Sequence, residues 1–329
     1  MDWSFIFTSS VSYALGAVTI AYCLAAVGLN MQFGYTGLLN FGQAAFLAAA
    51  GYGMAVMVTT FEMSFWVGIL VGLLAVVVLA MLLGLPTLRL RADYLAIVTI
   101  AAAEVVRLVV RSVKFKDTLG GSDGLQQFAN RFYELSPLPS DFRIRFGPFL
   151  FPNQEVWVMI VGWSLVAIFS IITFLLVRSP WGRILKGIRE DEDAVRSLGK
   201  NVYWYKMQAL ILGALMAGFG GFIIGIFFNA VSPDIYATTL TFAIYTILIL
   251  GGAARVMGPI LGAILFGFLF QFVLTTLNEA VRVGYIGFLD SNDTAPTRLV
   301  LVGIGLMLLM IFRPQGILGD RREIALDAR

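Results

Sequence analysis

Long apolar runs, separated by charged segments, constrain the fold of this chain more strongly than any other feature of its sequence. An α-helix needs roughly 20 residues to cross a bilayer, and inside lipid it satisfies its own backbone hydrogen bonds. Apolar runs near that length lie at about residues 11–30, 35–61, 65–88, 94–110, 156–177, 207–229, 240–250, 256–277 and 299–312. The sequence therefore predicts an all-α, polytopic transmembrane helical bundle of about nine spans, with about eight to ten compatible, in one domain over residues 1–329.

The composition excludes several function classes. Hydrophobic residues make up 59% of the chain and charged residues 13%, and the mean hydropathy is +0.87. A soluble domain could not bury so much apolar surface, so we expect an integral membrane protein. The chain has no histidine, and its lone cysteine, Cys23, can form neither an internal disulfide nor a thiolate cluster. We therefore expect no catalytic residue, no metal site and no cofactor bound by this chain.

The segment from Arg178 to Lys206, which we call the platform, is the main charged interruption. It holds seven Lys and Arg residues and four consecutive acids at 190–193. A segment this polar must lie in water between two spans. Its spacing predicts two short amphipathic helices, the second at 194–198 with the acids as its cap and Gly199 after its end. The platform is either a docking site for a cytoplasmic partner or a charged loop that only sets the topology.

The distribution of basic residues predicts the orientation. Cytoplasmic loops carry an excess of Lys and Arg, so the platform is placed in the cytoplasm. Loops between successive spans lie on alternate sides of the membrane, which places Arg89, Arg91, Arg255 and the C-terminal tail at about 313–329 on the same side as the platform. The Gly- and Pro-containing segment at about 112–155 becomes an external loop with little regular structure. No basic segment precedes the first apolar run, so we expect that run to be retained as a span, with the N-terminus outside.

Small residues recur every four positions at Gly213, Ala217, Gly221 and Gly225. This spacing gives one helix a smooth face that another backbone can approach closely. Such a face is compatible with ordinary helix packing or with a sliding contact in a transport cycle.

Two amides, Asn40 and Gln43, lie in the glycine-rich stretch 34–43 at the start of the second predicted span. Glycines destabilise a helix, and a broken helix start can present free backbone groups to a polar transported substrate. The amides could equally bond neighbouring helices, so both interpretations stay open.

The fourth predicted span carries charged side chains on one face. Asp93, Glu104, Arg107 and Arg111 share that face at helical spacing. Glu104 is the carboxylate placed deepest in the predicted spans, and a charge within the membrane is costly, so we expect it to pair with Arg107 one turn on. The pair is either a structural ion pair or part of a pathway or gate. Thr99, on the same span, is grouped with it as a candidate path residue.

Three other function classes find little support in the residues. The nearest approach to a phosphate-binding loop, Gly199–Lys200, is followed by Asn201 where Ser or Thr is needed, so any ATP hydrolysis belongs to another chain. An ion-coupled secondary transporter would need a series of intramembrane charges, whereas only Glu104 lies deep enough. An intramembrane enzyme would need paired carboxylates or a nucleophile with a base, and the predicted spans offer neither.

Six motifs in order cover nearly the whole chain: GYTGLLNFGQAAF at 34–46, RADYLAIVTIAAAEVVRLV at 91–109, GGSDGL at 120–125, SPWGRILKGIREDEDAVRSLGKNVYWYK at 179–206, GGAARVMGPILGA at 251–263 and FRPQGIL at 312–318. In these motifs the chain resembles the permease subunits of ABC importers for branched-chain amino acids, of the LivH/LivM type and most closely the LivM branch. It departs from that family at Ala254–Arg255, where a Gly-Thr-like pair is usual, and at Leu119, where Thr is usual.

The resemblance implies a type II importer-like permease, without catalytic activity, that moves Leu, Ile or Val across the bacterial cytoplasmic (plasma) membrane. Urea or a short-chain amide is an alternative cargo. The platform would be the coupling loop that docks on an ATPase subunit, through Gly187, Arg189, Glu190, Asp191, Ala194, Leu198 and Gly199. The implied partners are a second, LivH-type permease, two cytoplasmic ATPase subunits that use ATP and Mg, and an extracytoplasmic solute-binding protein.

Overall fold

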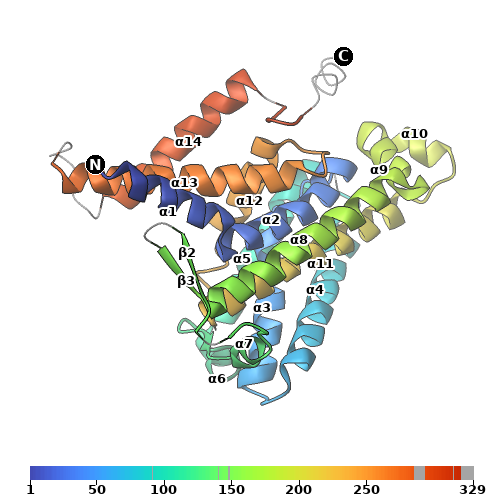
Figure 1. Ribbon diagram of the computed structural model, residues 1–329. Coiled ribbons are helices and arrows are strands. Elements are labelled where there is room, and N and C mark those ends of the chain that lie inside the picture. Colours follow the sequence, from blue (N-terminus) through green and yellow to red (C-terminus); the bar gives the residue numbers. More distant parts are fainter. Residues whose placement is uncertain (91, 140, 147–148, 285–292, 314, 320–329) are drawn as a thin grey trace.

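The computed structural model describes residues 1–90, 92–139, 141–146, 149–284, 293–313 and 315–319. These residues form a bundle of α-helices with a few short strands, which confirms the predicted all-α fold (Figure 1). Among them, the helical segments long and apolar enough to cross a membrane are Ala17–Gly34, Phe65–Thr87 (α4), Asn153–Arg178 (α8), Val202–Phe228 (α11) and Gly258–Arg282 (α13). Arg91 and tail residues 320–329, whose side of the membrane the sequence predicts, lie outside the described residues.

The other predicted spans also form helices. These are α5 (Ala92–Arg111), α14 (Thr294–Phe312), α3 (Gln43–Thr59) and α12 (Thr238–Gly251). The last two are apolar but have only 17 and 14 residues. At a rise of about 1.5 Å per residue, α12 covers roughly 21 Å, less than the roughly 30 Å of a hydrocarbon core. The apolar pattern located these helices but did not determine their lengths.

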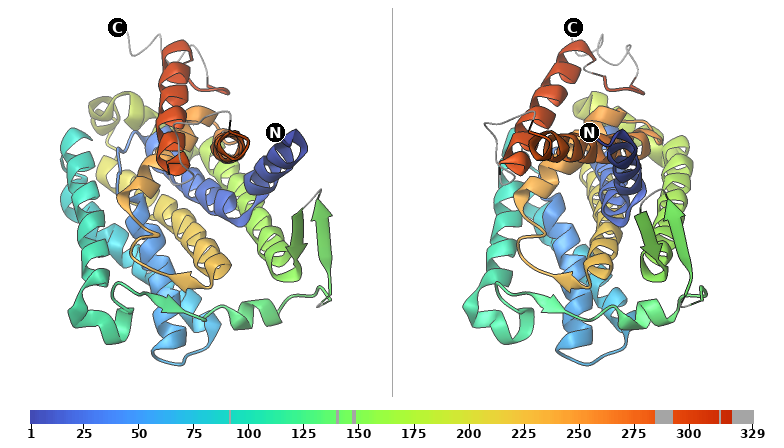
Figure 2. Two further views of the ribbon diagram at one scale, coloured as in Figure 1. Left: turned by 90° about the vertical axis from the view of Figure 1, so that its left-hand side faces the viewer. Right: turned by 60° about the vertical axis from the view of Figure 1, so that its left-hand side comes forward.

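The first predicted span, at 11–30, is wrong as a single helix. The chain forms α1 (Trp3–Leu15) and α2 (Ala17–Leu29), with Gly16 between them in an extended conformation (φ −73°, ψ 169°). The α1 helix packs along α13 instead of continuing the line of α2 (Figures 1 and 2). The helix after Gly16 then runs further than expected, because a π-helical turn, η1 (Asn30–Gly34), follows α2.

The core is built around α11, which packs against α2, α3 and α4. A Cβ atom built on Gly213 would lie 2.5 Å from the carbonyl oxygen of Gly28 on α2. One built on Gly221 would lie 2.2 Å from that of Leu47 on α3. Both distances are shorter than any real contact, so these glycines allow the backbones to touch. The predicted smooth face of residues 213–225 is therefore a helix-packing surface.

The outer helices present apolar side chains on their outward faces. On α4, Leu70 and Leu74 are 66% and 62% exposed, and on α8, Ile171 and Leu175 are 58% and 62% exposed. Exposed leucines in such continuous stripes are typical of helices that face lipid, because a soluble protein rarely leaves large apolar patches uncovered.

The segment after α5 forms short elements at one end of the bundle, opposite α9 and α10 (Figure 1). They are η2 (Val113–Phe115), α6 (Lys116–Leu119), β1 (Leu125–Gln126), α7 (Asn130–Glu134), β2 (Arg143–Phe146) and β3 (Phe149–Pro152). The β1 strand pairs antiparallel with β4 (Ala230–Val231), and β2 pairs with β3. Gly124 has φ +73°, and a Cβ there would lie 1.9 Å from the carbonyl oxygen of Val231. The described part of this segment therefore holds more regular structure than the sequence predicted, because its strands pair with β4 and with each other. Its position on the external side stays a prediction.

The platform forms α9 (Pro180–Glu190) and α10 (Glu192–Ser197) at the other end of the bundle (Figures 1 and 2). The Asp191 carboxylate accepts a hydrogen bond from the backbone N–H of Ala194 at 2.9 Å, which caps α10. The helix therefore starts earlier than the predicted residue 194, because its cap comes from the acid run itself. Gly199 follows the helix with φ +74°, as the sequence predicted.

Candidate functional site

The second predicted span does not begin near Tyr35 as its apolar run suggested. After η1 the chain turns through Gly37 (φ +73°), stays non-helical to Gly42, and forms α3 only from Gln43. We call residues 30–42 the hinge segment. The weakened helix start predicted from the glycines is confirmed, and the non-helical stretch is longer than expected.

Asn30 fixes the entry to the hinge segment. Its side-chain Nδ2 donates to the carbonyl oxygen of Arg255 at 2.8 Å, and its Oδ1 accepts from the backbone N–H of Ala254 at 2.9 Å. Ala254 has φ +58°, an unfavourable conformation for a residue with a side chain. The two hydrogen bonds therefore hold the turn at the position where the sequence departs from the glycine usual in the family it resembles.

Three amide side chains meet inside the bundle. Gln32, Asn40 and Gln43 are 0%, 1% and 0% exposed. The Oε1 atom of Gln32 accepts from Asn40 Nδ2 at 2.9 Å and from Gln43 Nε2 at 2.5 Å. Its Nε2 atom donates to the carbonyl oxygen of Leu210 on α11 at 2.9 Å. We call these three residues the amide cluster, and Gln32, which sequence analysis missed, is its centre.

One polar atom of the amide cluster has no partner. Gln43 Oε1 is buried and makes no hydrogen bond within the described part of the chain. A buried acceptor without a donor costs free energy. Asn40 and Gln43 both donate to Gln32, and it is Gln32 that reaches α11. A role for Asn40 and Gln43 in a pathway stays a prediction.

Thr99 fixes the same segment from α5. Its Oγ1 accepts from the backbone N–H of Phe41 at 3.0 Å, and the side chain is 1% exposed. From α12, the Tyr245 hydroxyl donates to the carbonyl oxygen of Asn40 at 3.0 Å, and its ring stacks on Phe41 with centroids 4.4 Å apart. Three of the five candidate path residues, Asn40, Gln43 and Thr99, are therefore brought together around the hinge segment.

Glu104 and Arg107 form a second site further along α5. Arg107 Nη2 lies 2.5 Å from Glu104 Oε1, which confirms the predicted pair. Arg107 Nη1 also lies 3.5 Å from Asp234, and the Thr238 hydroxyl donates to Glu104 at 3.2 Å. Sequence reasoning missed Asp234, which lies in the loop before α12. The ion pair thus joins α5 to the entry of α12.

The carboxylate placed deepest in the predicted spans is not the one with the least exposed side chain. The Glu104 side chain is 37% exposed, whereas that of Glu279 near the end of α13 is 10% exposed and pairs with Arg282 at 2.7 Å. Burial depends on how the helices pack, which position along an apolar run does not reveal. The depth of Glu104 in the membrane stays a prediction.

Arg189 ties the platform to the hinge segment. Arg189 Nη1, on α9, donates to the carbonyl oxygen of Gly34 at 2.7 Å. A Cβ on Gly37 would lie 3.3 Å from Arg189 Cγ, so the same side chain packs along the turn after η1. The link spans 155 positions in sequence and was not predictable from local spacing.

The other candidate coupling residues lie on the outside of α9 and α10. Leu198 is 78% exposed although it is a leucine. Glu190, Asp191, Ala194 and Gly199 are also exposed, whereas Gly187 is half-buried against Val195. Glu192 ties α10 to α11, because it contacts Arg196 within α10 at 2.9 Å and also Lys206 on α11. In the described part of the chain, no group of three His, Cys, Asp or Glu residues that could hold a metal ion is found.

Comparison with known proteins identifies the family. The model for branched-chain amino acid transport system permease components matches residues 13–312. The chain belongs to this family. The membership and the apolar helices together make it a multi-pass membrane protein. The resemblance inferred from the six motifs is confirmed.

Several curated permeases are similar to this family member. The high-affinity branched-chain amino acid transport system permease protein LivM of Escherichia coli (strain K12) is 30% identical, covering 96% of this chain and 72% of that protein. The corresponding LivH of the same strain is 25% identical and covers 91% of each. The probable LivM of Methanocaldococcus jannaschii is 22% identical over 91% of each. Among solved structures, PsaBC from Streptococcus pneumoniae in complex with Fab aligns with a TM-score of 0.39 at 15% identity, covering 92% of this chain and 91% of that one.

Proposed function

We propose that this chain is the permease subunit of an ATP-driven importer that moves Leu, Ile or Val into the cytoplasm. Family membership and the similarity to LivM and LivH support this cargo. The chain itself carries out no chemistry, and partner ATPase subunits use the ATP and Mg. The platform lies on the cytoplasmic side of the bacterial plasma membrane, where its basic residues agree with the positive-inside rule.

The observation that carries the proposal is the hydrogen bond from Arg189 to the carbonyl oxygen of Gly34. It joins an exposed surface of α9 and α10 to the hinge segment, which begins with a π-helical turn and is non-helical from Gly37 to Gly42. A partner that displaces the platform would pull on this carbonyl and thereby on Asn40 and Gln43 further along the hinge segment. Interrupted helices can absorb such a movement, because their backbone is not held by a continuous ladder of hydrogen bonds.

The assembly follows from the same similarity. The relatives named LivM and LivH are both permease proteins of branched-chain amino acid transport systems. We propose a second, LivH-type permease beside this chain, two ATPase subunits on the two platforms, and a solute-binding protein on the face of the 112–155 segment. In this arrangement the amide cluster and Thr99 form a gate along the path, and the Glu104–Arg107 pair braces the gate near the external end.

Uptake by the reconstituted complex tests the coupling role. Leu198→Asp places a charge on the most exposed leucine of the platform and should lower ATP-driven leucine uptake at least about tenfold, because a buried apolar contact with the ATPase would be lost. Val113→Asp is the matched control, since Val113 is 86% exposed in the opposite, external segment. Uptake that survives Leu198→Asp would refute the coupling role, and uptake of urea in place of leucine, isoleucine and valine would refute the cargo.

A further inference from the structure

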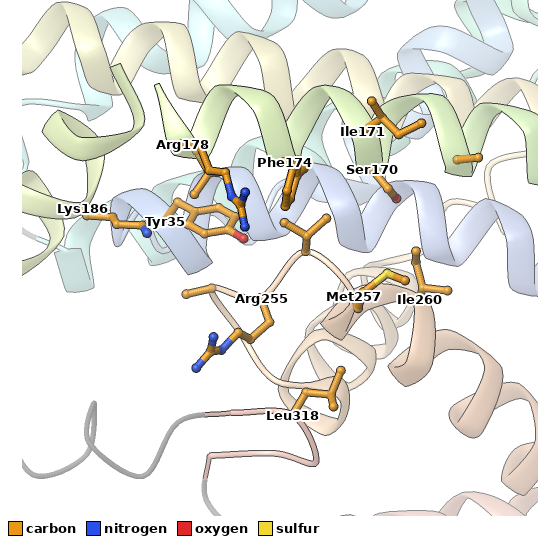
Figure 3. Close-up of a pocket in the computed structure, with 14 residues that line it drawn as sticks. Tyr35, Ser170, Ile171, Phe174, Arg178, Lys186, Arg255, Met257, Ile260 and Leu318 are labelled. Carbon is orange, nitrogen blue, oxygen red and sulfur yellow. The ribbon is translucent and has the colours of Figure 1, made fainter. Parts of the chain in front are cut away.

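A pocket of about 920 Å³ opens where α8, the platform and the turn before α13 meet (Figure 3). One end of it is basic, with Arg178 from the last turn of α8, Lys186 from α9 and Arg255 from the turn before α13 (Figure 3). The wall leading away from that end is apolar and includes Ile171 and Phe174 on α8 and Ile260 on α13. The pocket thus combines three basic side chains with a long apolar surface.

Aromatic rings hold two of these three side chains, Arg178 and Lys186, at the pocket. The Arg178 guanidinium carbon lies 3.9 Å from the centroid of the Phe174 ring, and the Lys186 ammonium lies 6.0 Å from that of Tyr35. Both are cation–π distances, and such contacts position a cation without neutralising it. Among the described residues that line the pocket there is no Asp or Glu. The site therefore favours an anion over a zwitterion, whose ammonium group would have no carboxylate to meet.

The pocket lies at the boundary between apolar and charged parts of the molecule. The outward face of α8 is apolar up to its last turn, where Leu175 is 62% exposed, and the charged platform starts at Arg178. Lipid headgroups lie at such a boundary, and basic pockets between transmembrane helices are suited to anionic ones. A single inorganic phosphate would engage the basic end but leave the apolar wall uncovered.

We propose that this pocket binds an anionic phospholipid. Its phosphate lies at the basic end, between Arg178 and Lys186, and an acyl chain follows the apolar wall past Ile171. With the orientation proposed above, the lipid belongs to the cytoplasmic leaflet, next to the platform that moves in the transport cycle. The binding itself depends neither on that orientation nor on the transport of any cargo.

Native mass spectrometry of the full-length chain in detergent tests the proposal. We expect phosphatidylglycerol to bind and phosphatidylethanolamine, which has no net charge, to bind about tenfold more weakly. The double variant Arg178→Gln/Lys186→Gln should weaken phosphatidylglycerol binding roughly tenfold, because each basic residue at a membrane surface contributes to anion affinity. The matched control, Arg183→Gln/Lys200→Gln, removes the same charge from the platform outside the pocket and should change binding less than about twofold.

Three results would overturn the proposal. They are an equal loss in the control, equal binding of the two lipids, and unchanged phosphatidylglycerol binding in the double variant. A fourth arm adds inorganic phosphate, and complete displacement of the lipid at equal concentration would identify a free-anion site instead. If the double variant does not fold, Lys186→Gln alone, at an exposed position, should still weaken binding measurably, and no change there would also refute the site. Because no ATPase or cargo takes part, failure here leaves the proposed function untouched.

Discussion

Leucine substitutions at two buried glutamines test whether Gln32 organises the hinge segment. Gln32 and Gln43 are both 0% exposed, so Gln→Leu makes the same change in volume and polarity at each. The Gln32 side chain makes three hydrogen bonds, to Leu210, Asn40 and Gln43, whereas the Gln43 side chain makes one, to Gln32. Each position therefore serves as the control for the other.

The expected difference follows from two hydrogen bonds. A side-chain hydrogen bond inside a membrane protein contributes about 0.6 kcal/mol on average and up to about 1.7 kcal/mol. Gln32→Leu should therefore lower the free energy of unfolding by about 1 to 3 kcal/mol more than Gln43→Leu. The polar groups that each substitution leaves without a hydrogen-bond partner change the free energy of unfolding in the same direction. Gln32→Leu strands the amide donor of Asn40, while Gln43→Leu also removes the carbonyl oxygen that had no partner.

The assay is unfolding of the full-length chain in mixed micelles by increasing SDS, followed by tryptophan fluorescence and circular dichroism. The double variant Gln32→Leu/Gln43→Leu should cost less than the sum of the single variants, by about 0.6 to 1.7 kcal/mol, because both remove the same 2.5 Å bond. Equal losses at the two positions, or strict additivity, would refute the assignment of Gln32 as the centre of the amide cluster.

Two further predictions use the same unfolding measurement. Gly213→Ala should destabilise the chain by about 1 to 3 kcal/mol, because its Cβ would lie 2.5 Å from a backbone oxygen of α2. The control is Gly303→Ala, whose Cβ would have no atom within 4 Å, and it should be neutral or stabilising by up to about 1 kcal/mol. The reverse order would show that α2 and α11 do not pack as described. Arg107→Gln should lower the free energy of unfolding by about 1 kcal/mol more than Arg111→Gln, because Arg107 contacts two carboxylates and its side chain is 18% exposed. The Arg111 side chain is 48% exposed and lies 3.8 Å from Asp234. Equal losses would mean that the Glu104 contact contributes nothing measurable.

Features that depend on near neighbours in the chain could be predicted from the sequence. The cap of α10 by Asp191 and the glycine after its end follow from capping chemistry within a few residues. The Glu104–Arg107 pair follows from spacing on one helix face. The break before α3 follows from glycine content. The length of the break did not, because η1 is held by a contact with α11 and the stretch to Gly42 by contacts with α5 and α12. The sequence does not reveal these contacts.

The sequence by itself determined the all-α membrane fold, the family and the presence of a charged platform, because hydrophobicity, charge and motifs act locally or on the chain as a whole. Only the tertiary structure decided that Arg189 reaches Gly34, that Gln32 joins the two predicted amides, and that α1 turns away at Gly16. These contacts depend on how helices distant in sequence are placed against one another. Side-chain reach across a packed interface is set by that placement and not by the order of residues along the chain.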